Sequence, residues 1–281
     1  NAERLAVLAK ELCDIVHKTD TTHPATLAAA FPELSAKLGF IDPLDVVGFN
    51  YKEHLYQEHH EAFPDKPFLG SENGHSLSAW KAVTDNDYIS GQFLWTGIDY
   101  LGEAHGWPIH GSGAGLMTLA GFEKTGYYRR QSMWSAIPMI HLATVSREQS
   151  CTTVWGETFQ RAIDCEFAPV HECWDYQHGE EVVVKCYTNL SEIELFLNGQ
   201  SKGIYQKDDD VDCILITLPF APGELKATGT GVHQNISHAL YSAGAACQIQ
   251  TDIYRIEQNT PAENIIFKHN NIMLSIFKIC F

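Results

Sequence analysis

The sequence lacks any run of basic residues. Its 281 residues include 19 Lys plus Arg against 35 Asp plus Glu, which gives a formal net charge of −16. Nucleic-acid-binding domains gather Lys and Arg on one face to pair with phosphates, so no nucleic-acid partner is expected. A neutral or weakly charged substrate fits this composition better.

Long hydrophobic runs are also missing. A membrane helix needs roughly eighteen or more apolar residues, and the longest candidate, residues 265–281, is interrupted by Lys268, His269 and Lys278. We therefore expect a soluble protein with no segment inserted in a membrane. No initiator Met precedes Asn1, so we also expect the chain to begin within a longer protein, and the lack of a signal peptide says nothing about export.

The cysteines show none of the spacings that hold a metal. No C-x-x-C pair occurs and no partner His lies at zinc spacing. The residues are Cys13, Cys151, Cys165, Cys173, Cys186, Cys213, Cys247 and Cys280. We interpret them as mostly structural thiols and leave any disulfide open. His54, His59 and His60 do not share one helical face, so a solvated helix surface is favoured over a metal site. The sequence predicts neither a metal nor a cofactor.

The first half of the chain alternates helical patterns with short apolar runs. Three- and four-residue spacing predicts a helix capped by Asn1, with an apolar face of Leu5, Leu8, Leu12 and Ile15 or Val16. Buried strands are predicted at residues 25–28, 45–50, 67–72 and 92–100, with connectors between them. A repeat of about thirty residues is typical of parallel α/β architecture, and four units make half of an eightfold barrel.

Beyond about residue 141 the pattern becomes β-rich. Polar and apolar residues alternate over residues 181–187, 193–197 and 213–218, separated by the turn pairs Asn198-Gly199 and Pro222-Gly223. This pattern predicts an immunoglobulin-like β-sandwich. The expected fold class is α/β plus all-β: the C-terminal half of a (β/α)8 TIM barrel over residues 1–140, a sandwich over residues 141–244, and a truncated or divergent segment over residues 245–281.

Three strand ends carry residues suited to a sugar. Glu72 stands where an apolar strand gives way to a polar loop, Tyr51 follows the preceding strand, and Trp95 lies near the end of the next. Catalytic residues of barrel enzymes sit at such C-terminal strand ends. A carboxylate can attack an anomeric carbon, while a phenol and an indole orient the sugar ring and stack on it. Each residue alone also fits a capping or core role, so the hypothesis depends on their shared placement.

The first half also carries four stretches that resemble, in this order, successive signatures of family 2 retaining glycoside hydrolases of the bacterial β-galactosidase type: DVVGFNY, PFLGSENGHS, SGQFLWTGIDYLGE and GLMTLAGFEKTGYYRRQSMW. The resemblance covers residues 1–135 as the second half of the barrel. Residues 180–244, with YTNLSEIELFLNGQSKG and PFAPGELKATG, resemble the sandwich that follows in that branch. The resemblance is compatible with a bacterial periplasmic or secreted location but does not fix it. It also leaves a homo-oligomeric state open.

The resemblance implies roles for single residues. Glu72 matches the family's nucleophile, and Tyr51 matches the tyrosine that hydrogen-bonds it. His75 matches a sugar-contacting histidine, Trp95 the indole that floors the subsite, and Asn50, more weakly, a further substrate contact. The implied activity is hydrolysis of an O-linked β-galactoside through a covalent glycosyl-enzyme, with β-glucuronides and β-mannosides as alternative substrates.

One element of the family pattern is not found. Retaining hydrolysis needs a second carboxyl about 5–5.5 Å from the nucleophile, and in this family it belongs to an Asn-Glu pair that ends the fourth strand. No Asn-Glu pair lies between Asn1 and Tyr51. We therefore expect the acid/base upstream of residue 1, in preference to Glu53 or Glu103.

A hypothesis of another class is a catalytically silent fragment that binds carbohydrate or serves as a structural module. In the sandwich, Trp155, Trp174 and Tyr176 could form a sugar-binding patch. Aromatic residues in such domains usually fill the core between the two sheets, however, so the core role is favoured.

Overall fold

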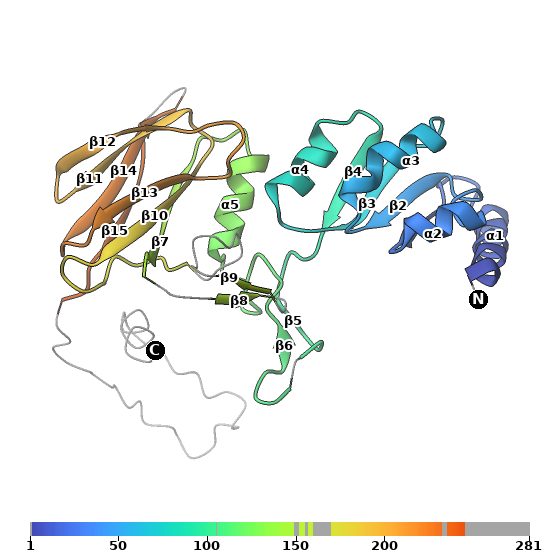
Figure 1. Cartoon of the computed structure of the whole chain (residues 1–281), viewed down its shortest axis with the longest axis horizontal. Coiled ribbons are helices and arrows are strands. Elements are labelled where there is room, and N and C mark those ends of the chain that lie inside the picture. The colour runs from blue at the N-terminus through green and yellow to red at the C-terminus, as the bar shows by residue number, and fades with distance from the viewer. Residues whose placement is uncertain are drawn as a thin grey trace, which may run out of the picture. The chain divides into compact units, whose positions relative to one another are not determined.

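The computed structural model describes residues 2–104, 106–148, 152–154, 157–159, 170–231 and 235–244 (Figure 1). The chain divides into two compact units, Asn1–Ser242 and Ala243–Phe281, and the elements described below all belong to the first. Predictions for the segment from residue 245 onward fall outside the described residues, as do those for Trp155, Cys151, Cys165, Cys247 and Cys280. No helix in the described part of the chain is both long and apolar enough to cross a bilayer.

A four-stranded parallel sheet forms the first half of the described chain. Its strands lie in the order of the sequence: β1 (Thr26–Ala29), β2 (Val46–Asn50), β3 (Phe68–Asn73) and β4 (Ile89–Leu94). Parallel neighbours need crossover connections, and helices supply them: α2 (Pro32–Ser35) with η1 (Ala36–Leu38), η2 (Glu53–Leu55) with α3 (Tyr56–Ala62), and α4 (Leu77–Thr84). The expected alternation of strands and helices is present, while the half barrel stays a prediction.

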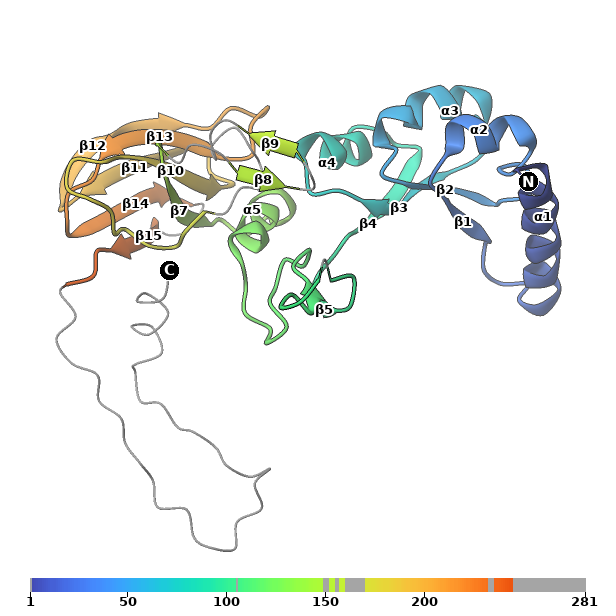
Figure 2. The ribbon, with the colours of Figure 1, turned by 60° about the horizontal axis from the view of Figure 1, so that its bottom comes forward.

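An aromatic cluster fills the space between this sheet and its helices. Phe49 of β2 and Phe68 of β3 are fully buried, with ring centroids 5.6 Å apart at 90°. Tyr56 of α3 packs on both rings, at 6.0 Å from Phe49 and 6.5 Å from Phe68. Figure 2 shows α2 and α3 on one side of the sheet. Edge-to-face pairs of this kind add about 0.5–1.5 kcal/mol beyond burial, so the cluster fixes β2 and β3 relative to α3.

Helix α1 (Ala2–Thr19) confirms the predicted helix but turns a different face inward. Ala9 and Cys13 are buried, and Cys13 packs with Ala25 and Leu44. The side chains of the predicted apolar face are 39–58% exposed in the described part of the chain: Leu5, Leu8, Leu12, Ile15 and Val16. Small side chains on the inward face allow the helix to approach its neighbours closely.

The strand predicted over residues 92–100 is shorter than expected. β4 ends at Leu94, and a two-stranded antiparallel ribbon follows, β5 (Tyr100–Leu101) with β6 (Gly111–Ser112). The reason lies in the backbone hydrogen bonds: Thr96 donates to Ala114 at 3.3 Å and accepts from Leu116 at 3.0 Å, so the chain leaves the sheet. Helix α5 (Thr125–Trp134) comes next.

Two antiparallel sheets form the second half. One has the order β13 (Ile214–Pro219), β10 (Glu181–Thr188), β7 (Ile140–Ser146). The other has the order β12 (Gln200–Gln206), β11 (Glu192–Leu197), β14 (Glu224–Thr230), β15 (Asn235–Tyr241). A further pair joins β8 (Thr152–Val154) to β9 (Glu157–Phe159). Asn198 and Gly199 have φ of 52° and 76°, the left-handed pair that a tight two-residue hairpin requires, and they connect β11 to β12 as the sequence predicts.

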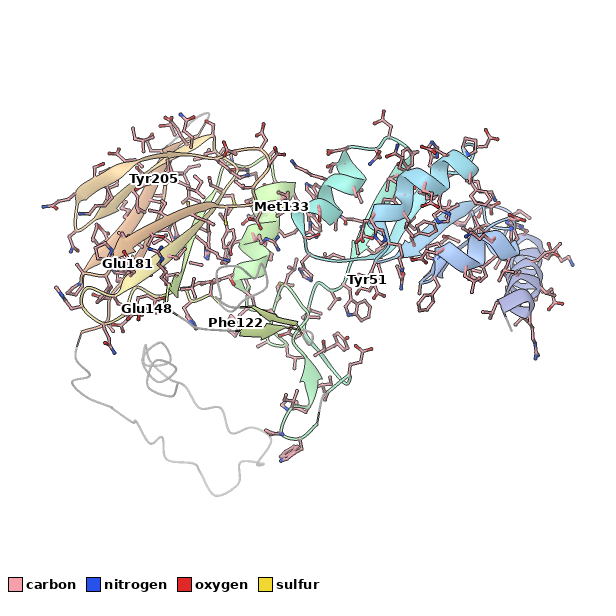
Figure 3. The ribbon with its side chains drawn as sticks, viewed as in Figure 1. Tyr51, Phe122, Met133, Glu148, Glu181 and Tyr205 are labelled. Atoms are coloured by element: carbon pink, nitrogen blue, oxygen red, sulfur yellow. The ribbon has the colours of Figure 1, made fainter. Side chains whose placement is uncertain are left out.

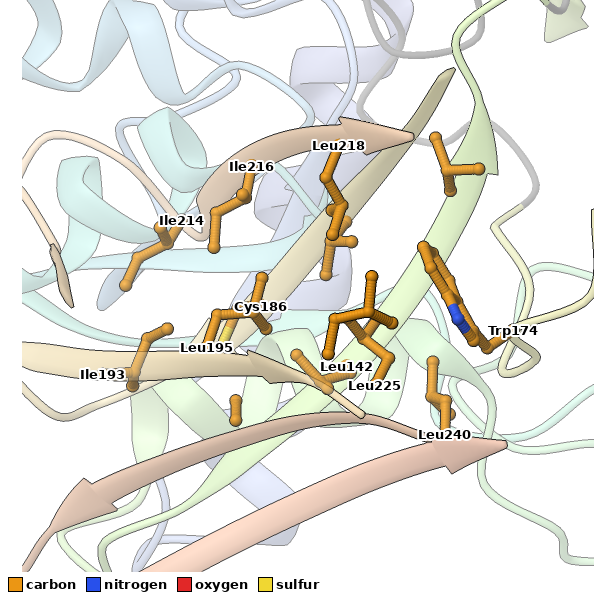
Figure 4. Packing of buried hydrophobic residues seen from close by; sticks show 14 of the residues in the cluster. Leu142, Trp174, Cys186, Ile193, Leu195, Ile214, Ile216, Leu218, Leu225 and Leu240 are labelled. Carbon is orange, nitrogen blue, oxygen red and sulfur yellow. The ribbon is translucent and has the colours of Figure 1, made fainter. Parts of the chain in front are cut away.

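The two sheets share one hydrophobic core, as expected for a β-sandwich (Figure 4). Leu142 of β7 and Val184 of β10 meet Leu195 of β11 and Leu225 of β14, all fully buried. Trp174 lies in the same core, and its indole N–H donates to the carbonyl of Ala221 at 2.9 Å. The core role is therefore the correct one for Trp174, and a sugar-binding patch that includes it is excluded by its burial.

Candidate active site

The C-terminal ends of β2, β3 and β4 lie side by side because the strands are parallel neighbours. Asn50 is in register with Glu72, and the N–H of Tyr51 donates to the carbonyl of Glu72 at 2.8 Å. The N–H of Trp95 donates to the carbonyl of Asn73 at 3.1 Å. Backbone pairing alone therefore brings four of the five predicted site residues to one edge of the sheet.

The carboxylate of Glu72 receives donors from the adjacent strand end. The amide Nδ2 of Asn50 lies 3.4 Å from Glu72 Oε2, and Asn50 Oδ1 accepts a hydrogen bond from the Ser71 hydroxyl at 2.7 Å. Because the oxygen of Asn50 is engaged by Ser71, its nitrogen is turned toward Glu72. The Tyr51 side chain forms a second hydrogen bond with Glu72.

Tyr51 has a left-handed backbone, with φ of 53°, directly after β2 (labelled in Figure 3). Burial raises the pKa of its hydroxyl well above the usual range, and the hydrogen bond and charge of Glu72 raise it further. The hydroxyl therefore stays protonated at any physiological pH and acts as a donor to the Glu72 carboxylate.

His75 lies in the loop after β3, where its Nε2 donates to the carbonyl of Trp95 at 2.8 Å. Burial lowers the pKa of this imidazole, and the nearby Arg130 charge lowers it too, while the Trp95 carbonyl acts in the opposite direction. We infer a neutral ring whose Nε2–H bond fixes the tautomer. His75 thereby joins the loop after β3 to the end of β4.

A cavity of about 650 Å³ opens beside these strand ends. Its walls are formed by Tyr51, Gly74, His75, Trp95, Glu103, Ala104, Ser112 and Ala114. This size suits a small ligand. Three predicted site residues, Tyr51, His75 and Trp95, thus line the cavity. Glu72 and Asn50 are not among its described lining residues, and they contact each other next to Tyr51. A second cavity of about 520 Å³ lies on the sheet of β11, β14 and β15, and none of the lining residues that the structure describes there is aromatic.

Two polar residues that sequence reasoning missed support the strand ends. Asn73 is fully buried, accepts from the Tyr56 hydroxyl at 3.2 Å, and donates from Nδ2 to Gln92 Oε1 at 3.0 Å. Gly70 makes room for it, because a Cβ at this position would overlap the Asn73 amide. Asn73, Gln92 and Gly70 all stand within the motifs that contain Glu72 and Trp95, so their proximity to those residues was the available signal.

Arg130 of α5 was also missed. Its Nη2 donates to the carbonyl of Gly74 at 3.2 Å. Its guanidinium lies 5.0 Å from the ring centroid of Trp134 and 5.7 Å from that of Trp80, within cation–π range. Arg130 is 2% exposed, and its contact with Gly74 holds the loop after β3, part of which lines the cavity.

The two carboxylates weighed as internal acid/base candidates have different positions. Glu53 Oε1 accepts from the Gly74 N–H at 3.2 Å, a loop-supporting contact. Glu103 lines the cavity and accepts a hydrogen bond from the Tyr100 hydroxyl.

The histidines considered as metal ligands are separated by their packing. His59 meets Phe49 edge-on at 5.1 Å, and His60 stacks on Tyr88 at 3.8 Å. Within the described ranges, no group of three or more His, Cys, Asp or Glu side chains could hold a metal ion.

Known proteins similar to this chain point to one family. Residues 179–235 match a family model described as a domain of unknown function (DUF4982). The chain is 29% identical over 270 residues to the β-galactosidase BoGH2A of Bacteroides ovatus, covering 79% of this chain and 28% of that protein. A crystal structure of a glycosyl hydrolase family 2 member from Bacteroides cellulosilyticus matches with a TM-score of 0.72 at 28% identity, covering 87% of this chain and 34% of the other.

In both sequence and structure the chain is thus similar to members of glycoside hydrolase family 2. The resemblance carried by the four stretches is thus confirmed. A putative β-glucuronidase of Formosa agariphila is 30% identical over 189 residues, covering 63% of this chain and 16% of that protein. A Bacteroides uniformis β-glucuronidase shares the fold, with a TM-score of 0.64 at 22% identity over 86% of this chain and 31% of the other. The chain therefore spans less than a third of the length of the curated relatives it matches.

Proposed function

We propose that the chain supplies the nucleophile and part of the sugar-binding wall of a retaining β-glycosidase acting on β-galactosides. One observation carries the proposal: the Glu72 carboxylate ends a parallel strand and is hydrogen-bonded by Asn50 and Tyr51 from the next strand end. Two donors fix the direction of the carboxylate, which nucleophilic attack on an anomeric carbon requires.

In the proposed reaction a Glu72 oxygen attacks the anomeric carbon and the bond to the leaving oxygen breaks. The leaving oxygen takes a proton from a second carboxyl, and a covalent glycosyl-enzyme forms. That second carboxyl, now a base, removes a proton from water, which attacks the anomeric carbon and releases Glu72. Trp95 offers an indole face to the sugar ring, and the Tyr51 hydroxyl donates to Glu72 as its charge changes.

The second carboxyl is part of the proposal. Glu53 is engaged by the Gly74 backbone, and Glu103 is held by Tyr100. The alignment covers 28% of BoGH2A, so most of that relative has no counterpart in this chain. We place the acid/base in such an additional region, together with four further strands that would make the parallel sheet half of an eightfold barrel.

We assign the substrate class from the relative whose alignment covers more of this chain. The relative named a β-galactosidase aligns over 79% of this chain, against 63% for the one named a putative β-glucuronidase. Both names concern the relatives, and the assignment to this chain is our inference.

A mechanism-based label tests the nucleophile directly. In a 2-deoxy-2-fluoro-β-galactosyl fluoride the leaving fluoride needs no proton donor, so trapping does not depend on the second carboxyl. We expect a covalent adduct on the peptide that contains Glu72, detected by mass spectrometry. Glu72→Gln should abolish the adduct, whereas Glu61→Gln, on the exposed side of α3, should retain it. An adduct on another residue, or none in the folded chain, would overturn the assignment.

A further inference from the structure

Glu103 reaches the cavity from the turn after β5 in an uncommon backbone conformation. Its φ is 48°, and that of the preceding Gly102 is 102°. A left-handed conformation is unfavourable for a residue with a Cβ, so it persists where the surroundings hold it. The hydroxyl of Tyr100 donates to the Glu103 carboxylate and supplies such a restraint.

Tyr100 also connects Glu103 to Trp95, whose indole is proposed to lie beneath the bound sugar. The rings of Tyr100 and Trp95 meet edge-to-face, with centroids 5.6 Å apart at 79°. Tyr100 lies near enough to Tyr51 to contribute to its raised pKa, after burial and Glu72. The carboxylate of Glu103 is therefore held at a defined place relative to both aromatic walls of the cavity.

The charge on the described lining of the cavity is of one sign. Among its lining residues that the structure describes, Glu103 has the one carboxylate, and none is Lys or Arg. His75 supplies no positive charge at neutral pH, since burial lowers its pKa. The basic side chains nearby are engaged elsewhere: Lys124 binds Asp99 at 2.7 Å, and Arg130 donates to the carbonyl of Gly74.

We infer that Glu103 selects a neutral glycoside against a uronic acid. Its carboxylate accepts a hydrogen bond from a sugar hydroxyl and repels a sugar carboxylate, which finds no cation on this wall. The inference deepens the proposed function and rests on it in one respect, that this cavity holds the sugar. Shared fold leaves the choice open, because β-glucuronidases also match this chain structurally.

Binding of two simple probes to the 281-residue chain tests the inference without any need for turnover. The probes are methyl β-galactopyranoside and methyl β-glucopyranosiduronate, with affinities measured by NMR titration. We expect the wild-type chain to bind the neutral probe more tightly. Glu103→Gln should reduce this preference about three- to tenfold, mainly by tighter binding of the uronide, because an exposed carboxylate is partly screened. Glu61→Gln, a charge change away from the cavity, should leave the preference unchanged.

Two further measurements separate charge from shape. Raising the ionic strength from about 0.01 M to about 1 M shortens the screening length from about 30 Å to about 3 Å, and it should strengthen uronide binding to wild type but not to Glu103→Gln. Tyr100→Phe, which frees the Glu103 side chain, should weaken binding of the neutral probe. An unchanged preference in Glu103→Gln, tighter binding of the uronide by wild type, or binding of neither probe overturns the inference. Failure of the proposed function is detected separately, by the covalent label on Glu72, so the two failures can be distinguished.

Discussion

The Nδ2 of Asn73 donates to the Oε1 of Gln92 across 3.0 Å, a partly buried hydrogen bond between β3, which carries the proposed nucleophile near its end, and its neighbour β4. On its other side Asn73 accepts from the Tyr56 hydroxyl of α3. One amide thus joins two strands and a helix immediately next to Glu72.

Asn73→Leu should destabilise the chain, because it keeps the volume but leaves the Tyr56 hydroxyl and the Gln92 carbonyl without their partner. Each buried polar group left unsatisfied costs about 1–3 kcal/mol. We expect a loss of about 2–4 kcal/mol in the free energy of unfolding, measured by urea denaturation. Tyr56→Phe removes only one of the two bonds and should cost less. Equal stability of Asn73→Leu and wild type would contradict this prediction.

Tyr51→Phe should lower kcat by more than it raises KM in a catalytically active protein that contains this chain. The hydroxyl donates to Glu72, whose charge changes in the transition state. A hydrogen bond to a charged group is worth about 1.5–3 kcal/mol, so a loss of roughly 10- to 100-fold in kcat is expected. Steady-state kinetics on an aryl β-galactoside give the answer. A change in KM alone would assign Tyr51 to simple substrate binding.

Trp95→Ala should weaken sugar binding and leave the sandwich intact. Its indole lines the cavity and is 38% exposed, which leaves a face available for the apolar side of a sugar ring. By analogy with base–aromatic stacking, we expect a loss of about 1–3 kcal/mol in inhibitor binding, measured by calorimetry. Trp107→Ala is a suitable control, since Trp107 is 90% exposed and is not among the described lining residues of the cavity. An unchanged inhibitor affinity would return Trp95 to a structural role.

The second half of the chain should lose stability in mild acid through His238. Burial lowers the pKa of His238 to about 4, the nearby His141 lowers it further, and Glu172 opposes both. The ring uses Nδ1 to accept a hydrogen bond from the Leu142 N–H at 3.1 Å, and Tyr128 stacks on His141 at 3.6 Å. The folded state therefore favours the neutral imidazole.

The direction of the pH dependence of stability follows from proton uptake by His238. Between its unfolded pKa of about 6.5 and its folded pKa of about 4, His238 binds a proton in the unfolded state only, so the free energy of unfolding decreases as the pH falls. We expect about 2 kcal/mol of loss after allowance for partial exposure. Urea denaturation at about pH 7 and about pH 4.5 measures it. His238→Asn keeps an acceptor near Nδ1 and should lose less. Equal losses in the two proteins would contradict this explanation.

Much of the strand-end placement could be predicted, because apolar runs locate strands and parallel strands end at one edge. The positions of Glu72, Tyr51 and Trp95 follow from that rule, and β2 and β3 confirm the predicted strands. The chemical roles of the three residues stay predictions. The buried role of Asn73 could not be predicted. Strict alternation from Phe68 would bury Glu72, but the register with β4 shifts between Gly70 and Asn73, which moves the buried position by one residue.

The packed face of α1 was unpredictable for a different reason. Periodicity identified the helix, yet Ala9 and Cys13, which carry little hydrophobic signal, are the residues that pack inward. Choosing between two candidate faces requires knowing which neighbours are present, and local sequence does not contain that information.

The tight fit between Gly70 and Asn73 has a consequence for how this segment can change over generations. A side chain at position 70 overlaps the Asn73 amide, so a first substitution there is harmful while Asn73 remains. Once position 73 carries a smaller side chain, the overlap between that side chain and a Cβ at position 70 is relieved. The order of mutations therefore decides which are tolerated, a case of sign epistasis. A combinatorial library at the two positions should return Gly70 wherever Asn73 is kept, and larger residues at 70 only in company with Ala or Ser at 73.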